Sequence, residues 1–179
     1  MSDSDQKTRN VFLALPNYGT LQFGAMDAAL DAAYGREGIN TYLWREGGSL
    51  LATNFNKCLA KCVGMADFEF FAMIHSDIGC SKGWLPTMIG EMDARGFDAI
   101  HVPTAIKNQD GLTSTALAYS DDSWDVPRRL TLRELDLLPD TFDVAQVNEC
   151  LQTNAAHLLP NTGCIVIRLG DWVREFPGF

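Results

Sequence analysis

"FEFFAMIHSDIGCSKGW", residues 68–84, combines a long apolar run with an abrupt polar end. Residues 68–74 are almost all large and apolar, and such a run predicts a strand covered on both faces, as in a parallel sheet between helices. His75, Ser76 and Asp77 follow directly. A buried strand that ends in an imidazole and a carboxylate indicates a binding site at its carboxyl end.

The chain on both sides of this strand continues the same pattern. Short apolar runs alternate with amphipathic stretches, which predicts strands and helices in βαβ order. We expect strands at residues 11–15, 41–44, 68–74, 99–104 and 164–169, and helices at residues 21–34, 51–62 and 84–92. Ser49 is the predicted cap of the second helix. In the first helix, the apolar residues at helical spacing are Phe23, Met26, Leu30 and Ala33.

The segment after residue 104 is less regular. Residues 112–119 alternate as a strand does, and residues 120–129 are polar and loop-like. Residues 130–138 suit either a strand or a short helix, and residues 148–160 are ambiguous. We therefore expect one α/β domain over the whole chain, with a mixed, mostly parallel central sheet flanked by helices.

Composition narrows the classes of function. The 179 residues suffice for one domain with a core, 46% of them are hydrophobic, and the formal net charge is -9. A negative charge of this size disfavours binding to bare nucleic acid or to an anionic membrane. No apolar run approaches the roughly 18 residues of a membrane span. The five cysteines have neither framework nor zinc-site spacing, so we expect reduced thiols in a cytoplasmic protein.

Polar residues follow the first three predicted strands, and the carboxyl ends of parallel strands meet at one edge of a sheet. The residues at these strand ends are Pro16, Asn17 and Tyr18 after the first strand, Arg45 and Glu46 after the second, and His75, Ser76 and Asp77 after the third. A nucleotide fits these side chains. The Tyr18 ring suits a base, and Glu46 or Asn17 can hydrogen-bond to base or ribose. Asp77 is a hard oxygen ligand for Mg²⁺ or Mn²⁺ that bridges a diphosphate.

The order and spacing of these motifs resemble family 2 glycosyltransferases and their relatives with the GT-A nucleotide-sugar-binding fold. The similar segments, which together span most of the chain, are "LALPNYG" (13–19), "GGSLLATNFNKCLAKC" (47–62), "FFAMIHSDIGCSKGWLPTMIGEM" (70–92) and "NTGCIVIRLGDW" (161–172). In that order they look like the family's first strand and Pro-containing turn, its loop and helix with Arg-Asn, its strand with the Asp-x-Asp metal motif, and its later strand under the acceptor site.

The resemblance implies a metal-dependent glycosyltransferase that moves a sugar from a nucleotide-diphosphate sugar, with UDP or GDP as the expected nucleotide, to an acceptor that the sequence does not identify. Residues 1–108 would form the nucleotide-binding half and residues 109–179 the acceptor-side half. Asp77 and His75 would ligate Mn²⁺ or Mg²⁺. The expected nucleotide-sugar site consists of Pro16, Asn17, Tyr18, Glu46, Asn54, His75, Ser76 and Asp77.

The chain departs from the family pattern at several positions. His75 replaces the first carboxylate of Asp-x-Asp, and Thr53 stands where the family often has Arg. The family's Glu-Asp pair and later His have no counterpart before Phe179. Either these residues belong to a segment beyond Phe179, or this chain relies on other groups. We therefore name no catalytic base.

Other residues and functions stay open. Asp121, Asp122 and Asp125 are candidate acceptor-side carboxylates, and Trp124 between them can stack on a sugar ring. A non-catalytic nucleotide-sugar-binding or assembly protein with a degenerate GT-A fold is the main alternative. A nucleotidyltransferase is a weaker one, because the loop after the first strand contains no Lys or Arg.

Overall fold

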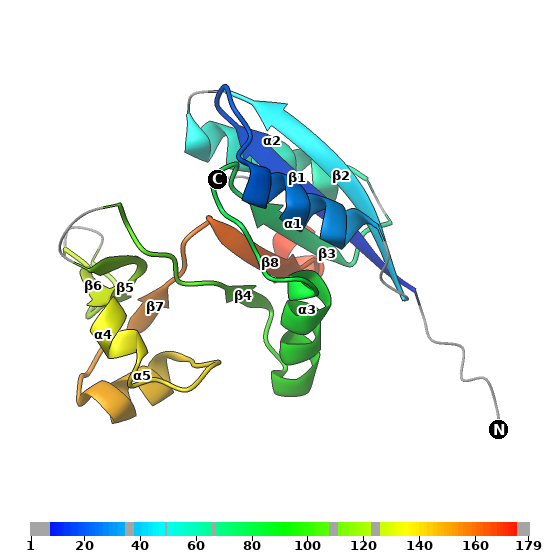
Figure 1. Cartoon of the computed structure of the whole chain (residues 1–179). Coiled ribbons are helices and arrows are strands. Elements are labelled where there is room, and N and C mark those ends of the chain that lie inside the picture. The colour runs from blue at the N-terminus through cyan, green and yellow to red at the C-terminus, as the bar shows by residue number, and fades with distance from the viewer. Residues whose placement is uncertain are drawn as a thin grey trace. The chain divides into compact units, whose positions relative to one another are not determined.

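Figure 1 shows the computed structural model, which describes residues 8–34, 38–48, 50–65, 67–107, 111–122 and 126–174. The chain divides into two compact units. The first consists of Met1–Ile100 and Thr162–Phe179, and the second of His101–Asn161. These limits differ from those of the predicted halves, 1–108 and 109–179, whose roles remain a prediction.

A five-stranded sheet forms the centre of the first unit, with the order β2-β1-β3-β8-β4. The strands are β1 (Arg9–Asn17), β2 (Ile39–Gly47), β3 (Phe70–Ile74), β8 (Cys164–Arg168) and β4 (Ala99–His101). β1 is parallel to both β2 and β3, whereas β8 is antiparallel to β3. The expectation of an α/β protein with a mixed, mostly parallel sheet flanked by helices is confirmed, and each predicted strand overlaps an observed one.

Three helices cover the two faces of this sheet. They are α1 (Phe23–Ala33), α2 (Leu51–Val63) and α3 (Trp84–Arg95), followed near the chain end by the short α6 (Asp171–Arg174). α1 and α3 pack on one face, and α2 packs on the other (Figure 1). The predicted cap Ser49 lies outside the described residues. None of the helices in the part of the chain that the structure describes is long and apolar enough to cross a membrane.

The sequence alternation of β1 explains how it contacts helices on both faces. Val11, Leu13 and Leu15 belong to the core under α1 and α3, whereas Phe12 and Ala14 belong to the core under α2. Successive side chains of a strand point to opposite faces, so a strand with apolar residues at every position must lie inside a covered sheet. All five residues of β3 are buried for the same reason, as the opening stretch predicts.

The predicted helix α1 is confirmed, but the larger apolar residues whose spacing indicated it do not form its buried face. The helix buries Ala25, Ala28, Ala29 and Ala32, while Phe23, Met26 and Leu30 are exposed. The small alanine side chains allow α1 and α3 to approach each other closely. The indole Nε1 of Trp84 reaches the Ala28 carbonyl oxygen at 3.0 Å. The alanines have the same helical spacing as the larger side chains, so apolar periodicity alone did not distinguish the two faces.

The second unit contains a three-stranded antiparallel sheet with the order β6-β5-β7. Its elements are β5 (Leu112–Ala118), β6 (Arg128–Thr131), α4 (Leu132–Leu135), α5 (Val144–Leu151) and β7 (His157–Leu159). The ambiguous segments thus each contain a helix and a strand. Capping boxes begin both helices, Thr131 with Glu134 and Asp143 with Gln146.

Candidate functional site

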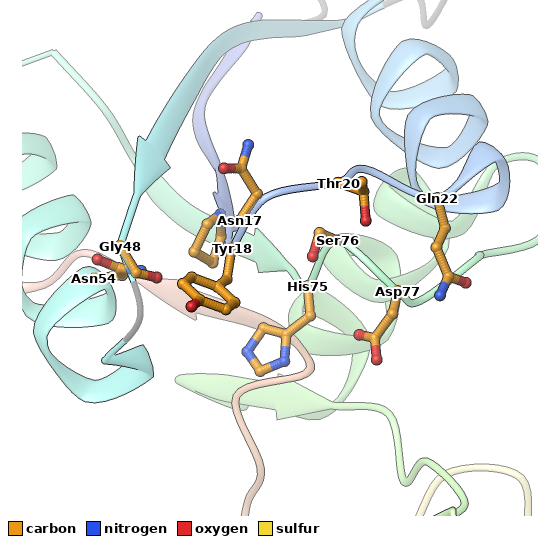
Figure 2. Close-up of a pocket in the computed structure, with 10 residues that line it drawn as sticks. Asn17, Tyr18, Thr20, Gln22, Gly48, Asn54, His75, Ser76 and Asp77 are labelled. Carbon is orange, nitrogen blue, oxygen red and sulfur yellow. The ribbon is translucent and has the colours of Figure 1, made fainter.

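A pocket of about 290 Å³ lies at the carboxyl ends of β1 and β3 in the first unit (Figure 2). The residues that line it are Pro16, Asn17, Tyr18, Thr20, Gln22, Gly48, Asn54, His75, Ser76 and Asp77. All the residues predicted for the nucleotide-sugar site except Glu46 are therefore neighbours. Thr20, Gln22 and Gly48 were missed by the sequence analysis, and their only signal was their place in the loops after the first two strands.

The topology of the sheet explains why a crevice forms there. β1 continues through α1 to β2 on one side of it, whereas β3 continues through α3 to β4, beyond β8 on the other side. The chain therefore leaves the two adjacent strands in opposite directions. Ligands of open α/β sheets bind at the carboxyl ends of the strands at such a switch point.

Backbone contacts hold the loops after β1 and β3 against each other. The Gln22 amide donates to the Ser76 carbonyl oxygen at 2.9 Å, and the His75 amide donates to Gly163 at 2.8 Å. The backbones at Gly24 and Gly79 also lie close together, and a Cβ added to Gly24 would lie 3.3 Å from the Gly79 Cα. Small residues at both positions thus fix the loop that presents Asp77 relative to the start of α1.

Asn54 forms the wall of the pocket beside the loop after β2. Its side chain is only 3% exposed, and its amide Nδ2 donates to the Gly48 carbonyl oxygen at 2.8 Å. The Gly48 amide in turn donates to Asn17 at 3.1 Å. A Cβ on Gly48 would lie 2.5 Å from the Asn54 Oδ1. Asn54 therefore joins the loops after β1 and β2, a structural contribution that the nucleotide prediction had not included.

Glu46 contacts side chains that do not line the pocket. Its carboxylate lies 3.4 Å from the Lys57 Nζ and accepts a hydrogen bond from the Trp44 indole at 3.4 Å. In the register of the sheet Glu46 is opposite Pro16, whose own side chain lines the pocket. Its predicted contact with a nucleotide remains a prediction, but it is the one member of the predicted set that the pocket does not include.

His75 and Asp77 give the pocket its electrostatic character. Burial lowers the pKa of the His75 imidazole, and the nearby Asp77 carboxylate opposes this shift. The imidazole is therefore neutral at pH 7 and can act as a ligand or acceptor. Its Nε2 lies 3.4 Å from the Thr162 hydroxyl. Among the described residues that line the pocket there is no Lys or Arg, so the protein supplies a carboxylate there without a cationic side chain.

Tyr18 lies at the mouth of the pocket. Its side chain is 76% exposed, although the strand before it is buried. Figure 2 shows the Tyr18 ring, the His75 ring and the Asp77 carboxylate projecting to the same side of the strand ends. An exposed aromatic ring beside polar groups has the chemistry needed to stack on a planar ligand.

The structure tests the metal prediction through the available ligands. In the described part of the chain no group of three or more His, Cys, Asp or Glu side chains could hold a metal ion. Asp77 and His75 are thus too few to bind a cation by themselves. Mg²⁺ is commonly bound by one or two carboxylates together with substrate phosphates. Binding of a cation by Asp77 and His75 together with a diphosphate therefore remains a prediction.

The candidate acceptor-side residues belong to the second unit. The Asp121 carboxylate lies 2.6 Å from the His157 Nε2, and both side chains are exposed. Asp122 is also exposed. Trp124 and Asp125 lie outside the described residues. Nothing in the described part of the second unit identifies a base, so the catalytic residue stays unnamed.

Comparisons with known proteins add little to this geometry. No protein-family model matches the chain. No curated protein matches it either. Among solved structures, the crystal structure of A197 from STIV is similar over 91% of this chain and 86% of that chain, at 13% sequence identity and a TM-score of 0.41. A likeness at this level carries no conclusion about function, so the site has to be interpreted from its own chemistry.

Proposed function

We propose that the protein is a GT-A-like glycosyltransferase that binds a nucleotide-diphosphate sugar together with Mn²⁺ or Mg²⁺. The observation that carries the proposal is the pocket in which Tyr18, His75 and Asp77 converge at the carboxyl ends of β1 and β3. Its volume of about 290 Å³ suits part of a nucleotide rather than a whole nucleotide-sugar. The sugar would extend from it toward solvent.

The charge of the pocket supports metal dependence. A diphosphate carries negative charge, and the described residues of the lining offer Asp77 but no cationic side chain. Direct contact between the two would be repulsive. A divalent cation held by Asp77 and the neutral His75 reverses this, and as a Lewis acid it would stabilise charge on the departing diphosphate by several kcal/mol.

The other lining groups have separate tasks in this proposal. The Tyr18 ring would stack on the base. Asn17, Thr20 and Gln22 provide amide and hydroxyl groups that can bind base or ribose. Asn54 would act indirectly, since it fixes the Gly48 loop. Transfer also requires a base for the acceptor hydroxyl, and we assign that role to no residue. A cytoplasmic location belongs to the proposal on the ground of cysteine usage alone.

A non-catalytic nucleotide-sugar-binding protein is the second candidate. It would use the same pocket, and the replacement of the first carboxylate by His75 favours it. The two candidates differ only in turnover, so binding and catalysis have to be measured separately.

Calorimetric titration of UDP-, GDP- and dTDP-sugars in Mn²⁺, repeated in EDTA, tests the proposal. We expect one nucleotide class to bind in Mn²⁺ and not in EDTA. Absence of binding by all of them would refute the proposal. Binding without nucleotide release in the presence of an acceptor mixture would instead support the non-catalytic alternative.

A further inference from the structure

We propose that Cys80 and Cys164 are a redox-active pair, in which hydrogen peroxide converts the two thiols to a disulfide that ties the loop after Asp77 to β8. Their Sγ atoms lie 3.9 Å apart, although the residues are 84 positions apart in the chain. Cys80 belongs to the loop after Asp77, and Cys164 is paired with Ile74 in the sheet. The sequence spacing of the cysteines gave no hint of this contact.

The two thiols have the complementary environments of an attacking and a resolving cysteine. Cys80 is half-buried, and the hydrogen bond with Cys164 lowers its pKa despite partial burial. Cys164 is fully buried, and its pKa is raised by the same hydrogen bond and by burial. Accessible thiols of lowered pKa beside a second thiol are the ones that peroxide oxidises.

The chemistry balances in two steps. The Cys80 thiolate attacks one peroxide oxygen, the O–O bond breaks, and hydroxide leaves, so Cys80 becomes a sulfenic acid. The Cys164 thiol gives its proton to that hydroxide, forming water, and its sulfur attacks the Cys80 sulfur. The S–S bond forms as the S–O bond breaks, and the second hydroxide takes up the proton that Cys80 had lost. The two thiols together lose two electrons, and the peroxide is reduced to two waters.

Disulfide formation would move the loop that carries Asp77. A disulfide has an S–S distance of about 2.05 Å, so the sulfurs must approach by about 1.9 Å. Cys164 lies in the central sheet, so we expect Cys80 and the loop from Ile78 to Gly83 to adjust when the sulfurs approach. This loop contacts α1 at Gly24 through Gly79. We expect oxidation to disturb the position of Asp77 and to weaken ligand binding, a consequence that rests on the proposed function.

The pair can be tested without any ligand. The variant Cys58→Ser/Cys62→Ser/Cys150→Ser keeps only Cys80 and Cys164. It is treated with hydrogen peroxide, unfolded, alkylated with iodoacetamide and weighed by intact mass spectrometry. We expect two alkyl groups before treatment, none after it, a mass loss of two hydrogen atoms, and restoration by dithiothreitol. Two alkylatable thiols after treatment, or oxygen addition to Cys80 without a disulfide, would overturn the proposal.

The natural chain provides a second measurement in case the triple variant does not fold. Peptide mapping after peroxide should recover a Cys80–Cys164 cross-link in the natural chain and in Cys150→Ser, a matched control at an exposed cysteine of the second unit. Cys80→Ser should give no such cross-link, and its absence from the natural chain would also contradict the proposal. Hydrogen exchange should change at residues 75–83 on oxidation. The cross-link is independent of nucleotide binding, so the two proposals can fail separately.

Discussion

The charged side chains at the amino ends of β1 and β3 are paired with one another, whereas those at the carboxyl ends are arranged differently. At the amino end, the Arg9 guanidinium lies 3.0 Å from the Glu69 carboxylate and 2.8 Å from the Asp93 carboxylate, and Arg168 lies 2.8 Å from Asp93. Both guanidinium groups also lie over the Phe70 ring, at 4.8 and 5.0 Å from its centroid. At the carboxyl end, the pocket lining, as far as the structure describes it, contains a carboxylate but neither Lys nor Arg.

This difference separates stability from binding within one sheet. The amino end is neutralised by the protein's own side chains, so it contributes to folding and offers little to a ligand. The carboxyl end offers a carboxylate, an aromatic ring and amide groups, and in our proposal a cation from solution completes it. Substitutions at the two ends should therefore change different measured quantities.

Gly79→Val should have the largest effect of the substitutions outside the direct ligands. A Cβ on Gly79 would already lie 3.4 Å from the Gly24 Cα, and the two methyl groups of valine would push the loop away from α1. We expect a loss of stability of about 1–3 kcal/mol from overpacking. Nucleotide binding should fall by at least roughly tenfold, since about 1.4 kcal/mol corresponds to a factor of ten. Denaturant titration and calorimetry measure the two effects.

Gly90→Val is the matched control, because nothing lies within 4 Å of a Cβ at this position of α3. It should change stability by less than about 0.5 kcal/mol. It should also leave nucleotide binding unchanged. Equal effects of the two substitutions would mean that the Gly24–Gly79 contact does not position the loop.

Tyr18→Ala should weaken nucleotide binding and leave stability unchanged. The ring is mostly exposed, so its removal costs little folding free energy. Stacking of a base on an aromatic ring is worth about 1–3 kcal/mol, which corresponds to about tenfold or more in affinity. Tyr18→Phe keeps the ring and should bind as the natural protein does. Calorimetry that finds Tyr18→Ala as tight as the natural protein would remove the stacking role.

Asp93→Asn should lower stability and leave nucleotide binding unchanged, with the smallest effect of the substitutions other than the controls. It removes the charge that both Arg9 and Arg168 contact, but the carboxylate is partly exposed and screened by solvent. We expect about 1 kcal/mol less stability in denaturant titration and no change in nucleotide affinity. A change in affinity as large as that of Tyr18→Ala would erase the distinction between the two ends.

The pH dependence of stability gives Asp93 a separate signature. Hydrogen bonds from Arg9 and then Arg168 hold the pKa of the Asp93 carboxyl below its ordinary value. The ionised Asp93 carboxylate therefore stabilises the folded protein fully above the unfolded pKa of about 3.9. This stabilisation is lost as the pH falls through the lower pKa of the folded state. The stability difference between the natural protein and Asp93→Asn should shrink in that acid range and stay constant from pH 5 to 8.

The sequence predicted the sheet well because strand patterns are local. The apolar run of β3 and the alternation of β1 each required a covered sheet, and the polar residues after them had to meet at one edge. The buried face of α1 did not follow from the sequence, because Ala28 and Phe23 are both apolar and the burial of Ala28 comes with its tertiary contact with Trp84.

The residues of the pocket were predictable where they directly follow strands, and less so elsewhere. Asn17, Tyr18, His75 and Asp77 have that position, whereas Glu46 turns to Lys57. The place of Gln22 in the pocket depends on its hydrogen bond to Ser76 across the loops. The thiol contact between Cys80 and Cys164 depends on strand pairing, which sequence spacing does not reveal.

The most direct test of the account is the affinity of UDP and GDP for Asp77→Asn in Mn²⁺, measured by calorimetry beside Asp98→Asn, an exposed carboxylate of the same unit outside the pocket. We predict that the natural protein and Asp98→Asn bind one of the two nucleotides only when Mn²⁺ is present. Asp77→Asn should lose about 2–3 kcal/mol, or roughly a hundredfold in affinity, while its thermal unfolding is unchanged. Binding by Asp77→Asn that equals that of the natural protein, or binding that persists in EDTA, would contradict the account.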